Sequence, residues 1–437
     1  MPCSDDYLQL GDATAIMPVY MKLRVDNFAL IKHAEIDIDG ITVIAGNNNS
    51  GKSTVGKILF TVFTALQNIN EKIENQYHRK TVDIITTMIA MLFGETEGYV
   101  LGEIEGEVRY YVSATPNGAV VDWENLFKCY EQALPVIAHP EEQNKIKSAV
   151  AQIDKLPRLR LMRDAVRPFF SSCFHQQINS LISPELPANV SLRIKNSNTK
   201  VTFEDHVATE IVHDIELNNK AIFYSSPQVV DLMDARMIDN VPIRYIISLL
   251  RQYDERLTDD SDLLEKSMLQ ERLKDVLKKI GDVLPGRILK LRRGYGLYRP
   301  EWKEPLYLKN LSMGLKAFVV LKMLLESNQL KDKDVLILDE PEIHLHPTWQ
   351  LVYAELIVLL QKEFDLSVVI TTHSNFFLNA IETYSRKYAT VDKLKLYLAD
   401  VQADGAVMKD VTNNPELIYQ KMAVAVDVLT SERLSYE

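Results

Sequence analysis

The stretch GNNNSGKST occupies residues 46–54 of this 437-residue chain, between the apolar run Ile41–Ala45 and a helical pattern that starts at Lys52. It matches the pattern G-x-x-x-x-G-K-[ST] in the strand, loop and helix context that a phosphate-binding loop requires. Every residue of the loop is a candidate nucleotide contact: Gly46, Asn47, Asn48, Asn49, Ser50, Gly51, Lys52, Ser53 and Thr54. The stretch predicts an α/β fold with a ligand at the carboxyl end of a buried strand.

The residue types in the loop suit this role. Gly46 and Gly51 allow a tight turn, so that backbone N–H groups and the start of the helix face an anion. Lys52 brings a positive charge to the β- and γ-phosphates, and the Ser53 hydroxyl suits a magnesium ligand. We therefore expect ATP and Mg²⁺ as ligands. A chance match is the alternative, and the surrounding strand and helix disfavour it.

Two further apolar runs end in polar residues. Residues 335–338 read as a strand buried on both faces, and Asp339 and Glu340 follow it directly. We expect Asp339 to hold Mg²⁺ and Glu340 to orient or deprotonate the attacking water. A second buried strand at 366–371 precedes His373, which we expect to sense the γ-phosphate. A structural role is the alternative for His373.

Residues 310–316 read NLSMGLK, ahead of a helical pattern at 315–326. They resemble the signature motif of ABC-type ATPases, although Met313 and Leu315 depart from the family pattern LSGGQ. In that family the signature serine and glycine face the γ-phosphate bound by the other subunit. The resemblance therefore implies that Ser312 and Gly314 contact nucleotide across a dimer.

Residues 339–347 read DEPEIHLHP. This run is similar to the soluble ABC ATPases of the OLD, RecF and SMC-like group, which includes ATPase subunits of bacterial antiphage systems such as Septu and PARIS. The resemblance covers residues 21–70 and 286–437. It implies a homodimer or higher homo-oligomer that controls a separate effector, a nuclease or toxin. The alternative is a RecF- or SMC-like DNA-maintenance ATPase that clamps DNA directly.

The expected fold is an ABC-type head with an antiparallel β subdomain and a largely helical insertion. We expect an N-terminal extension at 1–20, head segments at 21–120 and 286–437, and an insertion at 121–285 that includes head strands near 190–230. Within these segments we expect helices at 52–71 and 261–280, the second ended by Gly281, and strands at 107–113, 190–194 and 200–203. Gln228 follows an apolar strand and is a further candidate metal contact. A polar residue after a Ser-Pro turn is the plainer interpretation.

Composition narrows the class of protein. The net charge of −11 disfavours extensive nonspecific DNA binding, but two basic clusters leave DNA open as a partner. These clusters are Arg158, Arg160, Arg163 and Arg167, and Arg287, Lys290, Arg292, Arg293 and Arg299 interleaved with Tyr295 and Tyr298. A solvated face, or contacts within the head, is the alternative for both clusters and the one that we favour. No apolar stretch approaches the roughly 20 residues that span a bilayer. The three cysteines, Cys3, Cys129 and Cys173, fit a reducing compartment, so we expect a cytoplasmic protein without membrane contact.

Overall fold

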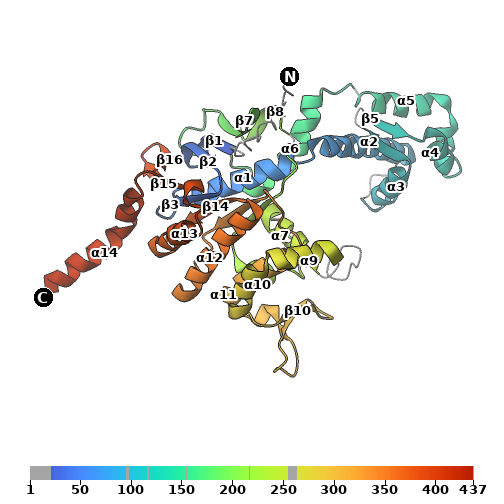
Figure 1. Cartoon of the computed structure of the whole chain (residues 1–437). Coiled ribbons are helices and arrows are strands. Elements are labelled where there is room, and N and C mark those ends of the chain that lie inside the picture. Colours follow the sequence, from blue (N-terminus) through green and yellow to red (C-terminus); the bar gives the residue numbers. More distant parts are fainter. Residues whose placement is uncertain are drawn as a thin grey trace, which may run out of the picture.

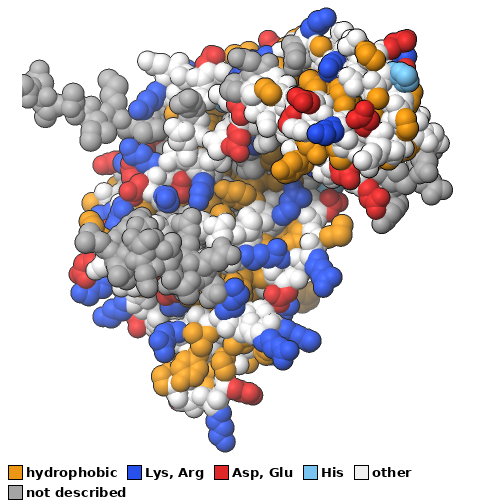
Figure 2. All heavy atoms as spheres, turned by 90° about the vertical axis from the view of Figure 1, so that its right-hand side faces the viewer, with side chains coloured by type: hydrophobic (Ala, Val, Ile, Leu, Met, Phe, Trp, Pro, Cys, Tyr) orange, Lys and Arg blue, Asp and Glu red, His pale blue; other side chains and the backbone are white. Residues whose placement is uncertain are grey.

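The computed structural model describes residues 21–94, 98–115, 118–153, 155–215, 217–253 and 263–436, so the extension expected at 1–20 lies outside the described residues. A twisted central sheet carries helices on both faces, and a mostly helical arm containing α2 to α5 projects to one side (Figure 1). Figure 2 views the molecule from that side.

The central sheet has eleven strands in the order β8-β7-β6-β1-β2-β16-β15-β3-β14-β13-β9. Its strands are β1 Met21–Phe28, β2 Ile31–Ile38, β3 Ile41–Ala45, β6 Ala188–Ile194, β7 Ser197–Glu204, β8 Val207–His213, β9 Ala221–Tyr224, β13 Val335–Asp339, β14 Ser367–Thr372, β15 Leu394–Gln402 and β16 Gly405–Asp410. From β15 to β9 all neighbours run parallel, whereas β2, β1, β6, β7 and β8 pair antiparallel. The predicted α/β fold with an antiparallel β subdomain is thereby confirmed.

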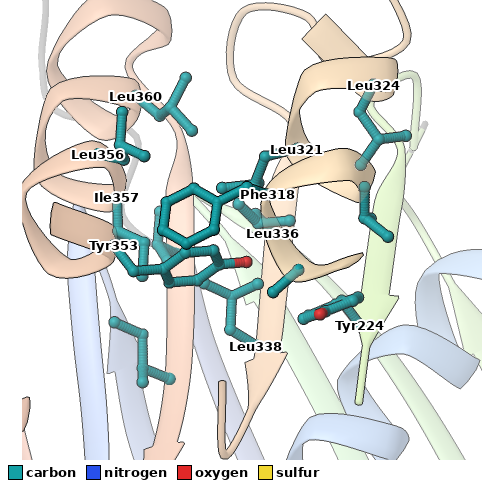
Figure 3. Packing of buried hydrophobic residues seen from close by; sticks show 14 of the residues in the cluster. Tyr224, Phe318, Leu321, Leu324, Leu336, Leu338, Tyr353, Leu356, Ile357 and Leu360 are labelled. Atoms are coloured by element: carbon teal, nitrogen blue, oxygen red, sulfur yellow. The ribbon is translucent and has the colours of Figure 1, made fainter. Parts of the chain in front are cut away.

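Helices cover the two faces of the parallel strands. In β13, Val335 and Ile337 join the core under α1 Lys52–Leu66 and α6 Arg158–Phe174. Leu336 and Leu338 join the opposite core, under α11 Met313–Glu326, α12 Pro347–Phe364 and α13 Asn375–Lys387. Figure 3 shows this second core, where the rings of Phe318 and Tyr353 meet edge to face above Leu338. The loop helix α1 and the signature helix α11 therefore lie on opposite faces of the sheet.

The arm has a hydrophobic core of its own. It contains α2 Ile69–Phe93, α3 Gly98–Tyr110, the hairpin β4 Val112–Thr115 and β5 Gly118–Val121, α4 Trp123–Tyr130, the 3₁₀ helix η1 Pro135–Ala138 and α5 Pro140–Ala151. Its buried cluster runs from Val82 to Val150 and so includes residues on both sides of position 120, the predicted boundary between head and insertion. The later part of the insertion instead joins the core under α11 and α12 through helices α7 Val241–Arg251 and α10 Lys274–Val283.

The remaining elements complete the head. A small antiparallel sheet is formed by β10 Arg287–Lys290, β11 Tyr295–Tyr298 and β12 Leu306–Tyr307, and α14 Glu416–Tyr436 ends the described chain. Two short 3₁₀ helices, η4 Leu308–Asn310 and η5 Val391–Lys393, precede α11 and β15. Among the described residues, no helix combines the length and apolar character needed to cross a membrane.

Three local predictions were wrong in whole or in part. Residues 107–110 belong to α3, which buries Val108 in the core of the arm, and only residues 112 and 113 of the expected strand are extended, as the start of β4. The helix expected at 52–71 breaks after Leu66, where Asn68 adopts a left-handed backbone conformation (φ 52°) before α2. The helix expected at 261–280 is two helices, α9 Leu263–Arg272 and α10, and residues 261 and 262 lie outside the described residues.

Gly281 does not end α10. It lies inside that helix, and a Cβ atom at this position would meet nothing within 4 Å, so no close approach requires glycine there. The expected strand pair at 190–194 and 200–203 is confirmed as the hairpin β6–β7.

Candidate nucleotide site

The loop between β3 and α1 has the backbone of a phosphate cradle. Gly46 lies so close to β15 that a Cβ atom would stand 2.7 Å from the carbonyl oxygen of Ala399. Gly51 has φ +81° and caps the amino end of α1, a conformation that suits glycine. Asn47, Asn48 and Asn49 are exposed at the tip of the loop, and the buried Ser50 donates a hydrogen bond to the Asn47 carbonyl (2.7 Å). The free N–H groups of the first turn of α1 can therefore face an anion.

Lys52 is buried at the base of the loop. Its Nζ donates to the carbonyl oxygens of Gly46 (2.9 Å) and Asn47 (2.7 Å) and lies 3.9 Å from Glu340 Oε1. Burial lowers the pKa of Lys52, and the neighbouring Glu340 carboxylate opposes that effect. Phosphate oxygens would satisfy this cation better than neutral carbonyls, because charge-assisted hydrogen bonds are stronger.

The two carboxylates at the end of β13, Asp339 and Glu340, contact different partners. Asp339 Oδ1 accepts a hydrogen bond from the Thr371 hydroxyl (2.6 Å), and the same hydroxyl accepts from the backbone N–H of Glu340 (3.1 Å). Glu340 has φ +50°, a strained conformation for a residue with a side chain, and its carboxylate turns toward Lys52. Thr371 thus fixes the positions of both acidic residues.

His373 follows the neighbouring strand β14. Its Nδ1 lies 3.4 Å from Glu340 Oε1 and 4.0 Å from Glu342 Oε1, and 41% of its side chain is exposed. Ser374 caps α13 by accepting from the N–H of Phe377, which fixes the backbone directly after the histidine. Lys52, Glu340 and His373, which come from three distant segments, therefore meet at one edge of the sheet.

Sequence reasoning missed three residues of this site: Thr371, Thr372 and Glu342. The Thr372 hydroxyl donates to Glu342 Oε1, while Glu342 Oε2 has no hydrogen-bond partner among the described residues. Burial raises the pKa of Glu342, and the hydrogen bond from Thr372 opposes the rise. The available signal was the pair of hydroxyl residues at the end of a buried strand, beside a second strand that ends in carboxylates.

The signature residues have different environments. Ser312 is exposed and caps α11, where its Oγ accepts from the N–H of Leu315 (3.4 Å). Gly314 is buried, and a Cβ atom there would stand 3.0 Å from both the His344 carbonyl oxygen and the Trp349 ring. Packing of α11 against the start of α12 thus accounts for Gly314. Within the described residues, no hydrogen bond or ion pair joins Ser312 or Gly314 to the phosphate loop of the same chain.

Gln228 lies in the 3₁₀ helix η2 Pro227–Val230, just after β9, the parallel neighbour of β13. It is exposed, and Asp231 beyond it forms an ion pair with the buried Lys316 of α11 (2.7 Å). The segment after Gln228 is therefore attached to the signature helix. No group of three or more His, Cys, Asp and Glu side chains in the described ranges could hold a metal ion, so Ser53 and Asp339 would have to share a cation with a ligand.

The basic clusters are partly engaged within the chain. Arg158 donates to Asn70 Oδ1 at the base of the arm. Arg299 donates to the Pro285 carbonyl (2.8 Å) and lies over the Trp302 ring (4.6 Å). These contacts account for two of the basic residues without nucleic acid.

A family model described as an AAA ATPase domain matches residues 21–378. The chain belongs to the AAA ATPase domain family. The protein is an enzyme that binds and hydrolyses ATP.

Three solved SMC head structures are similar to this ATPase over most of its length. An SMC head bound to the C-winged helix domain of ScpA shares 12% identity at a TM-score of 0.43, covering 92% of this chain and 99% of that chain. The SMC head domain from Thermotoga maritima shares 12% identity at a TM-score of 0.39, covering 90% of this chain and 99% of that chain. A Pyrococcus furiosus Smc head with an extended coiled coil, bound to the C-terminal domain of ScpA, shares 11% identity at a TM-score of 0.41. That match covers 95% of this chain and 100% of that chain.

Proposed function

We propose that this ATPase is a dimeric switch, in which ATP on the loop of one copy is also contacted by Ser312 of a second copy. The arrangement of the two half-sites carries this proposal. Lys52, Glu340 and His373 converge at one edge of the sheet, whereas Ser312 is exposed at the start of a helix on the opposite face from α1. A second copy of the chain can therefore bring its Ser312 to the nucleotide on Lys52 of the first copy.

The residues of the site divide the work. The backbone of residues 46–54 and the Lys52 cation bind the phosphates, and Ser53 and Asp339 would hold Mg²⁺, which neutralises charge on the β- and γ-phosphates. Glu340 orients or deprotonates the attacking water, and His373 contacts the γ-phosphate. Hydrolysis of ATP to ADP and phosphate removes the ligand that favours the dimer.

The output of the switch is conformational and acts on a separate protein in the cytoplasm. The DEPEIHLHP run supports a role in antiphage defence through its resemblance to the Septu and PARIS ATPases, with a nuclease or toxin as effector. The contact between Asp231 and Lys316 supports a route from Gln228 to the signature helix. The second candidate is a DNA-clamping ATPase, favoured by the basic residues and tyrosines around β10 and β11. A DNA-stimulated ATPase rate would support that candidate.

Mass measurement of a hydrolysis-deficient variant tests the dimer. Glu340→Gln should retain ATP binding, stop hydrolysis and shift the protein toward a dimer when ATP is added. Adding Ser312→Arg should cancel the shift and leave ATP binding on Lys52 intact. The matched control is Ser267→Arg, because Ser267, which lies within α9, is also an exposed serine. A monomer at saturating ATP in the Glu340→Gln protein would contradict the proposal.

Mixing two inactive variants tests whether the sites are completed in trans. In a heterodimer of Lys52→Ala and Ser312→Arg chains, one site carries both lesions and the other carries neither. ATPase activity should then partly return. Hydrolysis at an undiminished rate by a strictly monomeric protein would overturn the proposal.

A further inference from the structure

A groove lies between α9, α10, β10 and the end of α11, and its cavity volume is about 580 Å³. Aliphatic side chains from all four elements form its floor: Leu269, Leu273, Leu277, Ile288 and Leu325. Leu289, which is 38% exposed, continues this apolar surface onto β10. We call this feature the α9–α11 groove. Its floor offers room for several aliphatic side chains of a ligand.

The rim of the groove is basic. Lys274, Lys278 and Arg287 line it, and Lys278 and Arg287 have no ion-pair partner among the described residues. The acidic lining residue, Glu326, is already neutralised, because it pairs with Lys322 (2.9 Å) and accepts from Tyr253 (2.7 Å). In Figure 2, Lys and Arg side chains surround hydrophobic ones in the lower part of the molecule. The rim is thus positive on a chain whose net charge is −11, and it would attract an anionic partner.

The groove also touches the helix that carries the signature motif. Helix α11 begins after Ser312, and its last turn supplies Leu325 and Glu326 to the groove. The ion pair of the buried Lys316 with the partly exposed Asp231 anchors the first turns of the same helix. One rigid helix of 14 residues therefore connects the proposed dimer contact with the groove.

We propose that the α9–α11 groove docks an acidic amphipathic helix of a partner protein. Its apolar residues would fill the floor, and its carboxylates would pair with Lys278 and Arg287. A protein fits better than nucleic acid, because phosphates would gain nothing from a floor of leucine and isoleucine. Coupling of this docking to ATP rests on the proposed function, whereas docking itself does not.

The test uses synthetic peptides as probes and the full chain as receptor. An end-labelled peptide of about 18 residues, with leucine on one helical face and glutamate on the other, is titrated and followed by fluorescence anisotropy. We expect saturable binding that weakens about tenfold or more in Lys278→Glu/Arg287→Glu. Leu289→Ser, at an exposed position, should also weaken it. The matched control is Lys128→Glu/Arg160→Glu, an exposed lysine and arginine outside the groove, which should bind normally.

Three results would overturn docking of an acidic helix. The first is equal affinity for a peptide of the same composition whose leucines are scattered around the helix. The second is unchanged affinity of the amphipathic peptide for the Lys278→Glu/Arg287→Glu variant. The third is displacement of the peptide by short duplex DNA that itself loses affinity in that variant, which would make the groove a nucleic-acid surface. Basal ATPase activity of the groove variants should stay unchanged. If peptide binds normally but Glu340→Gln fails to dimerise with ATP, the proposed function fails and the docking site stands.

Discussion

Replacing Glu355 with glutamine should destabilise the head in a manner that depends on pH. Glu355 lies on α12 with 8% of its side chain exposed, and it accepts hydrogen bonds from Lys279 of α10 (2.7 Å), Lys387 of α13 (2.7 Å) and Tyr388 (2.6 Å). Burial alone would raise the pKa of this carboxyl, but the bonds from Lys279, Lys387 and Tyr388 outweigh it and lower the pKa to about 2.

The displacement of the pKa sets the size of the effect. A pKa of about 2 in the folded protein against an ordinary 4.5 corresponds to at most about 3 kcal/mol of stability. The two lysine side chains are 32% and 55% exposed, so screening by water reduces the expected contribution to about 2 kcal/mol. Because the folded-state pKa is the lower one, this contribution is complete above pH 4.5 and is lost as the pH falls toward 2.

Urea unfolding of the wild type and Glu355→Gln, followed by both tryptophan fluorescence and circular dichroism, measures this difference. The variant should be less stable by about 2 kcal/mol at pH 7, and the gap should shrink by more than half at pH 3. Glu363→Gln, on the same helix, is the matched control and should change little. A Glu355→Gln protein as stable as the wild type at pH 7, or a gap that does not change with pH, would refute the reasoning.

Two further predictions concern hydroxyl groups. Thr371→Val removes the donor to Asp339 and should lower kcat by about 10- to 100-fold with a smaller change in ATP affinity, as steady-state kinetics and nucleotide titration would reveal; an unchanged kcat would contradict the positioning role. Tyr353 is fully buried, and its hydroxyl has no hydrogen-bond partner among the described residues. Tyr353→Phe should therefore leave thermal stability unchanged or raise it by up to about 1 kcal/mol, and a loss of more than about 1 kcal/mol would show that the hydroxyl is satisfied.

Short local patterns carried the site prediction because each motif combines a fixed residue spacing with a strand end. Each motif lies at the end of a buried strand: the loop around Lys52 follows β3, Asp339 and Glu340 stand at the end of β13, and His373 follows β14. In a parallel sheet such strand ends meet at one edge, so their proximity could be expected. The roles of Thr371 and Glu342 could not be predicted from the sequence, because they depend on how neighbouring strands align rather than on spacing within one segment.

Errors arose where tertiary packing overrode local preference. Residues 107–113 are rich in β-branched and aromatic side chains, yet Val108 is buried by the other helices of the arm. Helix α1 ends at Leu66, and Asn68 precedes α2 in a left-handed conformation that asparagine tolerates, a signal that the apolar spacing around it masked. Gly314 matched the signature pattern, but only the structure reveals its close contact with Trp349.

Helix α2 runs from the core under α1 into the arm. Its first turns, with Ile73 and Tyr77, are packed into the main core, and its last turns form the core of the arm. Lys72 of α2 donates to the Thr64 and Gln67 carbonyls at the far end of the loop helix α1, so the two helices are fastened together there. Twenty-five residues of helix span about 37 Å. A tilt of about 5° at the base of α2 would therefore move its far end by about 3 Å.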